Sequence, residues 1–278
     1  MKDPSIAMTI AGSDCSAGAG LQADLKTFSS FGVHGLTAVT CVVSETPLTF
    51  SKVHPIPPVI LQDQIQLLLE TYPITAIKTG MLYSKAHIVA VCELLANCDI
   101  PIVVDPVMVA STGDPLLVED ALEAISERLL PLASVITPNL AEAQMLLGRP
   151  VDTPEKQEQA AREISEKYKS TCYLKGGHMK VEGDTKHRDI LATNGSVESF
   201  EGSHLELPQS HGTGCTLAAA ITAGLSEGLS IHKASLRAHR FTHHALKDSS
   251  SWLTPAQDKT VSHLDQIQRG PLASHQFY

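Results

Sequence analysis

The sequence predicts a three-layer α/β fold, in which a mostly parallel central sheet is covered by helices on both faces. Short apolar runs of β-forming residues alternate with longer segments whose apolar residues recur at helical spacing. Several short runs are apolar at nearly every position, as expected for strands that are buried on both faces of a parallel sheet. The dipeptide Asn194-Gly195 between two β-like runs predicts a type I′ hairpin. We place this hairpin as an antiparallel addition at one edge.

The elements follow one another in a regular order. Strands are predicted at residues 5–12, 36–43, 74–80, 101–107, 133–139 and 171–177, and the hairpin at 188–200. Helices are predicted at residues 20–31, 58–72, 154–169, 216–228 and 232–248, with further helical stretches after three of the strands. The helix at 216–228 is apolar nearly all round, so we expect it to be buried beside the last helix. We expect residues 1–248 to form one domain, followed by a partly irregular tail (249–278), mostly loop with one short helix.

The composition excludes several classes of protein. The chain has 278 residues, of which 43% are hydrophobic and 18% charged, and a net charge of −9. This acidic balance argues against nucleic acid or an anionic membrane as the main partner. The six cysteines form no C-x-x-C pair, the N-terminus does not resemble a signal peptide, and no apolar run approaches the roughly 20 residues that span a bilayer. We therefore expect a soluble, reduced protein of the cytoplasm.

Polar residues at the carboxyl ends of the predicted strands are the candidates for a site, because open parallel sheets bind ligands there. HGTGC (residues 211–215) precedes an apolar helix, and its glycines predict a loop whose backbone N–H groups hold an anion. Lys175 is suited to bridging phosphates beside that loop. Asp105 and Glu142 could hold Mg²⁺ through water, since this ion prefers carboxylates, waters and phosphates. The other histidines show no metal-binding spacing, and we interpret them as structural.

Three alternatives stay open on the residues alone. Residues 18–23 satisfy G-x-G-x-x-A at a helix start, with Glu45 after the next strand, which is typical of dinucleotide-binding dehydrogenases. The polar loop before these glycines argues against that interpretation, because the fingerprint needs a tight turn. His211 and Cys215 could form a base and thiol nucleophile, as in hydrolases. A sensor that only binds nucleotide is the third alternative, and it has little need of both Lys175 and Cys215.

The ordered set of motifs resembles the hydroxymethylpyrimidine/phosphomethylpyrimidine kinases of thiamine biosynthesis, within the ribokinase-like superfamily that also contains pyridoxal kinases. The resemblance runs from about Ile6 to His244. It is carried by TIAGSDCSAGAGLQADLKTF, IKTGML, VVDPVM, GDPLL, ITPNLAEAQMLLG, LKGGH and HGTGCTLAAAI. It implies phosphorylation of 4-amino-5-hydroxymethyl-2-methylpyrimidine and then of its monophosphate, with ATP and Mg²⁺. It also makes a homodimer plausible.

The resemblance implies a role for each matching residue. The catalytic and anion-binding residues would be Gly212, Gly214, Cys215 and Lys175. The residues that contact ATP would be Lys175, Asn139 and Thr213, and the metal region would contain Asp105 and Glu142. The residues that line the pyrimidine pocket would be Gly12, Asp14, Glu45 and Met81, and Gly18 to Gly20 would form the flexible start of the first helix.

Two positions depart from the family pattern. The family usually has Gln where this chain has Glu45, and an Asn-containing version of the stretch that contains Gln209. The sugar kinases of the superfamily have Asp at the position of Cys215, where it takes the hydroxyl proton. A phosphate acceptor needs no base and would be repelled by a carboxylate, so a thiol with a pKa lowered at a helix N-terminus would tolerate both acceptors.

Overall fold

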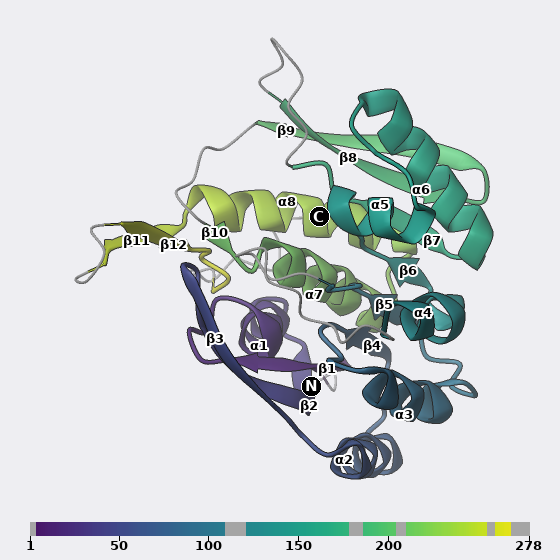
Figure 1. Cartoon of the computed structure of the whole chain (residues 1–278), viewed down its shortest axis with the longest axis vertical. Helices are drawn as coiled ribbons and strands as arrows, with labels where there is room; N and C mark the ends of the chain where they lie inside the picture. The colour runs from purple at the N-terminus through teal and green to yellow at the C-terminus, as the bar shows by residue number, and fades with distance from the viewer. Residues whose placement is uncertain (1–3, 109–120, 178–185, 204–209, 255–258, 268–278) are drawn as a thin grey trace.

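The computed structural model describes residues 4–108, 121–177, 186–203, 210–254 and 259–267. Within these residues, nine strands form the central sheet in the order β3-β2-β1-β4-β5-β6-β7-β8-β9 (Figure 1). Pairing is parallel from β2 to β7 and antiparallel at both ends. The strands are β1 (Ile6–Asp14), β2 (His34–Thr46), β3 (Thr49–Pro55), β4 (Ala76–Thr79), β5 (Ile102–Val104), β6 (Val135–Ile136), β7 (Thr171–Leu174), β8 (Lys186–Thr193) and β9 (Ser196–Ser203).

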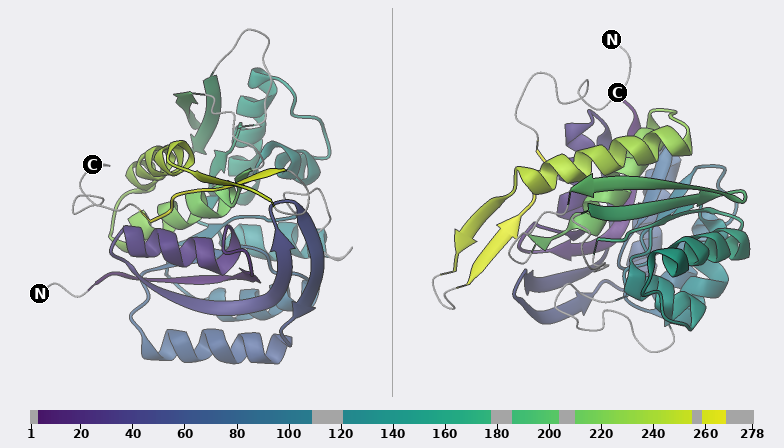
Figure 2. Two further views of the ribbon diagram at one scale, coloured as in Figure 1. Left: turned by 90° about the vertical axis from the view of Figure 1, so that its left-hand side faces the viewer. Right: turned by 90° about the horizontal axis from the view of Figure 1, so that it is seen from above.

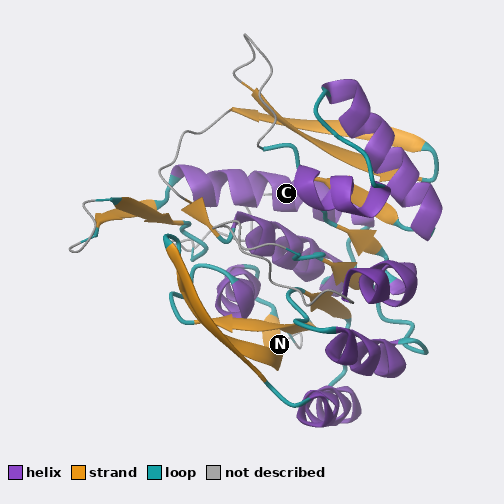
Figure 3. Cartoon of the chain, viewed as in Figure 1, coloured by secondary structure: helices purple, strands orange, loops and turns teal. Residues whose placement is uncertain are grey.

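Helices cover both faces of this sheet (Figure 3). Each face has its own apolar core. The helices are α1 (Gly20–Ser30), α2 (Pro58–Thr71), α3 (Lys85–Leu95), α4 (Ala121–Ala124), α5 (Leu140–Leu147), α6 (Pro154–Tyr168), α7 (Thr213–Ser226) and α8 (Ile231–Lys247). Helices α1, α7 and α8 pack on one face around Phe28, Leu217 and Phe241, and α2 to α6 pack on the other. The predicted three-layer, ribokinase-like arrangement is confirmed.

Helix α7 lies at the centre of its layer, as its sequence predicts. Every residue from Thr216 to Ser226 is buried. The helix begins at Thr213, three residues earlier than expected, because Gly212 adopts a left-handed φ of 89° and acts as the N-cap. Part of the predicted anion-binding loop is therefore the first turn of this helix.

The two edges of the sheet end in antiparallel hairpins. The predicted hairpin is β8–β9, and its central residues Asn194 and Gly195 have φ values of 47° and 80°, as a type I′ turn requires. The opposite edge holds the pair β2–β3, with a register shift between Ser44 and Glu45. Strand β3 was not predicted, because most of its residues are polar or partly exposed and leave no apolar pattern.

The expectation of a short helix in the tail is wrong for its described residues. They contain two strands, β11 (Ser250–Leu253) and β12 (Thr260–His263), joined with β10 (Ser210–His211) in a second sheet (Figure 2). Strand β12 lies between β10 and β11, parallel to β10, so the end of the chain returns to the start of α7. No described helix is long and apolar enough to cross a membrane.

Candidate active site

Lys175 and Asp105 form an ion pair at the carboxyl edge of the sheet. Lys175 directly follows β7, and its Nζ lies 2.9 Å from Asp105 Oδ1, after β5. The same oxygen accepts from Thr137 Oγ1 at 3.0 Å. Burial alone would raise the pKa of Asp105, but the charge of Lys175 holds it below the ordinary value. The side chain of Lys175 keeps 16% of its surface exposed, so the ammonium is paired and still accessible.

The first turn of α7 borders this ion pair. A Cβ on Gly214 would lie 3.0 Å from Lys175 Nζ and 3.7 Å from Asp105 Oδ2, so a side chain there would require the ammonium to shift. Thr213, Gly214 and Cys215 begin the helix, where backbone N–H groups lack intrahelical acceptors. A cation and the positive end of a helix therefore meet at one point, which is an arrangement suited to phosphate.

The structure corrects the expectation for the Cys215 thiol. Burial raises its pKa to about 11; the charge of Lys78 opposes this, and those of Asp24 and Asp105 add to it. The expected lowering at a helix N-terminus is therefore overridden, mainly by burial of the thiol. At neutral pH, Cys215 carries its proton. His211 Nε2 lies 2.9 Å from Asp14 Oδ2.

Asn139 and Glu142 form a capping box at the start of α5. Asn139 Oδ1 accepts from the Glu142 N–H at 2.9 Å, and Glu142 Oε2 accepts from the Asn139 N–H at 2.7 Å. Glu142 is buried, and burial raises its pKa to about 7; the charge of Lys175 opposes this and that of Asp105 adds to it. Asn139, a predicted ATP contact, thus uses its side-chain oxygen to hold Glu142, a predicted metal ligand, in place.

Lys78 lies among the polar residues at strand ends that the sequence offers as candidates, but the sequence assigns it no role. It is fully buried on β4, and its Nζ lies 2.8 Å from both carboxylate oxygens of Asp24 on α1. Thr9 Oγ1 donates to Asp24 Oδ2 at 2.6 Å. Burial would lower the pKa of Lys78, but Asp24 and Cys215 raise it, which places the ammonium close to the thiol. No local pattern links a strand lysine to a helix aspartate, so only the fold reveals this pair.

A small apolar wall lies beside the end of β1. A Cβ on Gly12 would approach Cys41 Sγ at 2.9 Å, Met81 Sδ at 3.6 Å and Val43 at 3.7 Å. Cys41, Val43 and Met81 form a core cluster, to which Phe50, Val53, Tyr83 and Val107 add partly buried side chains. The predicted pocket residues Gly12 and Met81 are thus neighbours, on a surface that can contact the face of a flat ring.

Asp14 and Glu45 lie above this wall and differ in what they contact. Asp14 is buried, and its oxygens accept from the backbone of Ser16, Gly18 and Ala19 and from His211. Burial would raise its pKa, but the hydrogen bond from His211 and those from the backbone hold it at about 2. These contacts fix the loop before α1.

Glu45 turns inward after the register shift in β2. A carboxylate oxygen lies within 4.8 Å of ligand atoms of both Asp14 and His211. Burial raises its pKa, and the charge of Asp14 adds to this effect. The side chain is therefore partly buried, beside Asp14 and His211.

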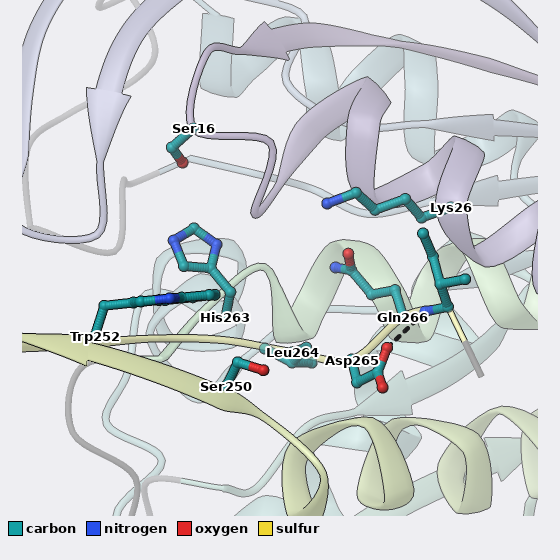
Figure 4. Close-up of a pocket in the computed structure, with 9 residues that line it drawn as sticks. Ser16, Lys26, Ser250, Trp252, His263, Leu264, Asp265 and Gln266 are labelled. Carbon is teal, nitrogen blue, oxygen red and sulfur yellow. Dashed lines mark hydrogen bonds between the residues drawn. The ribbon is translucent and has the colours of Figure 1, made fainter. Parts of the chain in front are cut away.

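The tail closes the far side of the loop before α1. A pocket of about 410 Å³ lies between that loop and the tail, with Ser16, Lys26, Trp252, His263 and Gln266 among its lining residues (Figure 4). Gln266 Nε2 donates to Gly18 O at 3.1 Å and to Thr216 Oγ1 at 2.9 Å. The tail thus joins the start of α1 to the start of α7. His178, Gln209 and the GDPLL motif lie outside the described residues.

Comparison with known proteins places these features in context. The family described as phosphomethylpyrimidine kinase matches residues 14–257. A hydroxymethylpyrimidine/phosphomethylpyrimidine kinase from Rhizobium meliloti is 38% identical over 87% of this chain and 90% of its own length. A thiamine biosynthesis bifunctional protein from Geobacter sulfurreducens is 37% identical over 86% of this chain and 49% of its own length.

Two solved structures show how far the architecture extends. Pyridoxal kinase from Staphylococcus aureus, in complex with AMP-PCP and pyridoxal, has a TM-score of 0.84 and 34% identity, covering 95% of this chain and 94% of its own. Phosphomethylpyrimidine kinase from Clostridium difficile has a TM-score of 0.75 and 33% identity, covering 85% and 97%.

Proposed function

The chain belongs to the phosphomethylpyrimidine kinase family, and we propose that it transfers phosphate from ATP to 4-amino-5-hydroxymethyl-2-methylpyrimidine and then to the resulting monophosphate. The product would be the diphosphate used in thiamine diphosphate biosynthesis. The chain is a phosphotransferase by membership of this family, and the two successive acceptors are the proposal.

One observation carries this function: Lys175, Asp105 and the first turn of α7 meet at a single point. Phosphoryl transfer depends on positioning and on neutralising the charge of the transferring group, with little covalent work for the protein. The ammonium of Lys175 would move between Asp105 and a phosphate oxygen, while the N–H groups of Gly214 and Cys215 bind the same group. The apolar wall at Gly12 and Met81 lies on the acceptor side.

Asp105 and Glu142 fit a magnesium ion by the chemistry of their donors. Both are buried carboxylates at the edge where nucleotide phosphates would lie, and Mg²⁺ takes oxygen ligands together with water. The raised pKa of Glu142 indicates a carboxylate whose negative charge is under-compensated there. The ion would supply positive charge that neutralises the phosphates of ATP. Asn139 would hold Glu142 in place, and Thr213 would face the nucleotide.

Cys215 would contact the acceptor oxygen as a neutral thiol. With its pKa raised to about 11, it can form a hydrogen bond with the alcohol in the first step without acting as a strong base. A neutral group also does not repel the anionic acceptor of the second step, whereas a carboxylate would repel it. The proposal of a thiol that tolerates both acceptors therefore stands without a lowered pKa.

Pyridoxal phosphorylation is the second candidate, favoured by one observation. The pyridoxal kinase from Staphylococcus aureus matches more of this chain than the phosphomethylpyrimidine kinase from Clostridium difficile, and with a higher TM-score. Glu45 would discriminate between the two rings, because an aminopyrimidine offers a donor amine beside an acceptor nitrogen. Asp14 would act here by fixing the loop rather than by reading the ring.

A substrate screen tests the proposal. Purified protein with Mg-ATP is assayed for ADP release with hydroxymethylpyrimidine, its monophosphate, pyridoxal and ribose, and the products are identified by mass spectrometry. We expect turnover of the first two substrates and accumulation of the diphosphate. Faster phosphorylation of pyridoxal or ribose would show that the assignment is wrong. The Lys175→Met variant controls for contaminating kinases.

Three further features stay predictions. We propose that residues 1–248 form the single catalytic domain, that the protein is a homodimer, and that it acts in the cytoplasm on a small molecule. Light scattering on the purified chain measures the oligomeric state, and a monomer at micromolar concentration would contradict the dimer.

A further inference from the structure

A cluster of metal-ligating side chains lies outside the site described above, on the opposite side of the Lys175–Gly177 loop. His187 and Asp189 come from β8, where residues two apart share a face, and His239 comes from α8. One nitrogen of each ring and one carboxylate oxygen all lie within 4.8 Å of one another. We propose that these three residues bind a divalent transition-metal ion of the zinc class, independently of the proposed kinase function.

The separations between the three atoms favour a metal over simple hydrogen bonds. His187 Nε2 lies 3.4 Å and His239 Nδ1 3.3 Å from the same oxygen, Asp189 Oδ2. Tetrahedral zinc with bonds near 2.0 to 2.1 Å separates its ligand atoms by about 3.3 Å. Two other histidines of this chain form ordinary hydrogen bonds with carboxylates, and these are shorter: 2.9 Å between His211 and Asp14, and 2.7 Å between His232 and Glu198.

The groups around the cluster hold each ligand as metal sites require. His239 Nε2 lies 3.4 Å from the Glu201 carbonyl oxygen, and the His187 ring lies against Gly202, to whose backbone it is hydrogen-bonded. A histidine that uses its second nitrogen in this way presents the first to a metal. In neutral imidazoles of this tautomer, the nitrogens that face Asp189 carry lone pairs, so a bound metal ion would take the place of the proton that otherwise joins each ring to the carboxylate.

Asp189 is supported in the same way. Its other oxygen, Oδ1, accepts the Gly176 N–H at 2.9 Å, and the Tyr173 hydroxyl donates to Oδ2 at 2.9 Å and lies 3.1 Å from His239 Nδ1. All three ligands are largely buried, with 8% of the Asp189 side chain, 9% of His239 and 19% of His187 exposed. The ion would enter at His187, where water can complete its coordination.

The donor set selects the class of metal. Two imidazoles and one carboxylate suit zinc and similar ions, whereas Mg²⁺ prefers oxygen ligands. Bound there, the ion would join the β8–β9 hairpin to α8 and, through Asp189, hold Gly176 next to Lys175. Its role would be to stabilise this end of the molecule.

Zinc titration of the full chain tests the proposal. Protein without an affinity tag is treated with EDTA, dialysed and titrated with ZnCl₂ by isothermal titration calorimetry. We expect one saturable site in the wild type, and affinity lower by about 100-fold or more in His187→Gln and in His239→Asn, since losing a ligand should cost at least as much as losing a supporting residue. Both substitutions keep an amide near the lost nitrogen, so the fold should be retained.

The matched control is His232→Gln. His232 lies on α8, as His239 does, but it is exposed and bonded to Glu198. This variant should bind zinc as the wild type does. Binding of Co²⁺ to the wild type should give the visible spectrum of a four-coordinate ion without sulfur ligands, which keeps the test decisive if a variant fails to fold. No saturable binding to the wild type, equal affinity in all variants, or a spectrum with thiolate ligands would overturn the proposal.

Discussion

Two buried lysine–aspartate pairs lie at the same edge of the sheet, and they differ in how fully each ammonium is engaged. Lys78 and Asp24 are both 0% exposed and joined by two contacts of 2.8 Å. Lys175 keeps 16% of its side chain exposed and contacts Asp105 through one oxygen. The first pair has no capacity left for a ligand, so it serves the fold. The second can exchange its partner for a phosphate oxygen.

Cys215 interacts electrostatically with members of both ion pairs. Its thiol affects the pKa values of Lys78 and of Lys175, and Asp24 and Asp105 both raise its own. The contrast predicts that Lys78 variants lose stability, that Lys175 variants lose turnover, and that Cys215 variants change the balance between the two acceptors.

Lys78→Met should have the largest effect on stability. It leaves Asp24 buried without a counter-charge, and breaking a buried pair in this way costs about 3 to 5 kcal/mol. Urea unfolding measures the loss. The double variant Lys78→Met/Asp24→Asn should recover much of it, because the unpaired charge is removed.

The control for that experiment is Lys85→Met, at an exposed pair with Glu123, which should change stability by less than about 0.5 kcal/mol. A Lys78→Met protein with wild-type stability but no activity would reverse the roles of the two pairs.

Lys175→Met should lower kcat by on the order of 10²-fold or more, as expected when a donor that stabilises developing charge is removed. The KM for the pyrimidine should change little, and stability should fall less than in Lys78→Met, because Thr137 still donates to Asp105. Steady-state kinetics of both phosphorylations check this. Turnover near the wild-type rate would remove Lys175 from the reaction.

Cys215→Ala should slow the alcohol step by about tenfold, below the 10²- to 10⁴-fold of a true general base, because the thiol stays protonated. The phosphate step should change less. Cys215→Asp should partly restore the first step and depress the second by charge repulsion. Single-turnover rates for the two acceptors decide it, and equal losses in both steps would contradict the role between two acceptors.

Glu45→Gln should have the smallest effect of these variants on the enzyme, because Glu45 has no lysine partner among the described residues. A glutamine amide matches the neutral ring edge, whereas a carboxylate needs an extra proton on itself or on the ring. That shared proton is lost as pH rises, so the wild-type KM for hydroxymethylpyrimidine should increase by about fivefold, or about 1 kcal/mol, between pH 5.5 and 8.5.

In Glu45→Gln this dependence should flatten, while the KM for ATP stays unchanged. Burial and the charge of Asp14 raise the pKa of Glu45, which favours a proton on this carboxylate. Superimposable profiles for the two proteins would show that Glu45 does not read the ring.

The sequence predicts the central sheet, and it predicts that residues after its parallel strands lie close together, because parallel strands place their carboxyl ends at one edge. Asp105 and Lys175 follow β5 and β7, and the structure brings them together as that rule requires. No such rule predicts the Lys78–Asp24 pair, because it joins a strand to a helix on one face of the sheet. A lysine within an apolar strand gives no sign of its partner.

The pKa of Cys215 shows a second limit. A helix N-terminus alone would lower the pKa of the thiol. Burial raises it instead, and the charges of Asp24 and Asp105 add to this effect. The sequence does not show how close these groups lie to the sulfur. The strand β3 and the tail strands were missed for another reason. Their residues are mostly exposed or partly exposed and leave no apolar periodicity. Pairing holds them in place, β3 on its neighbour β2, β11 on β12, and β12 also on the distant β10.

Strand β12 follows α7 and α8 in the sequence and pairs with β10, which precedes both helices. Gln266, just after β12, bonds to both Gly18 and Thr216. Contacts between residues so far apart in sequence form late in folding, because the intervening chain must be ordered first. During synthesis the N-terminal part of a chain folds earliest. The loop that would bind phosphate therefore receives its last support from residues made after all the strands of the central sheet. A nascent chain that has folded its central sheet would still lack a finished active site.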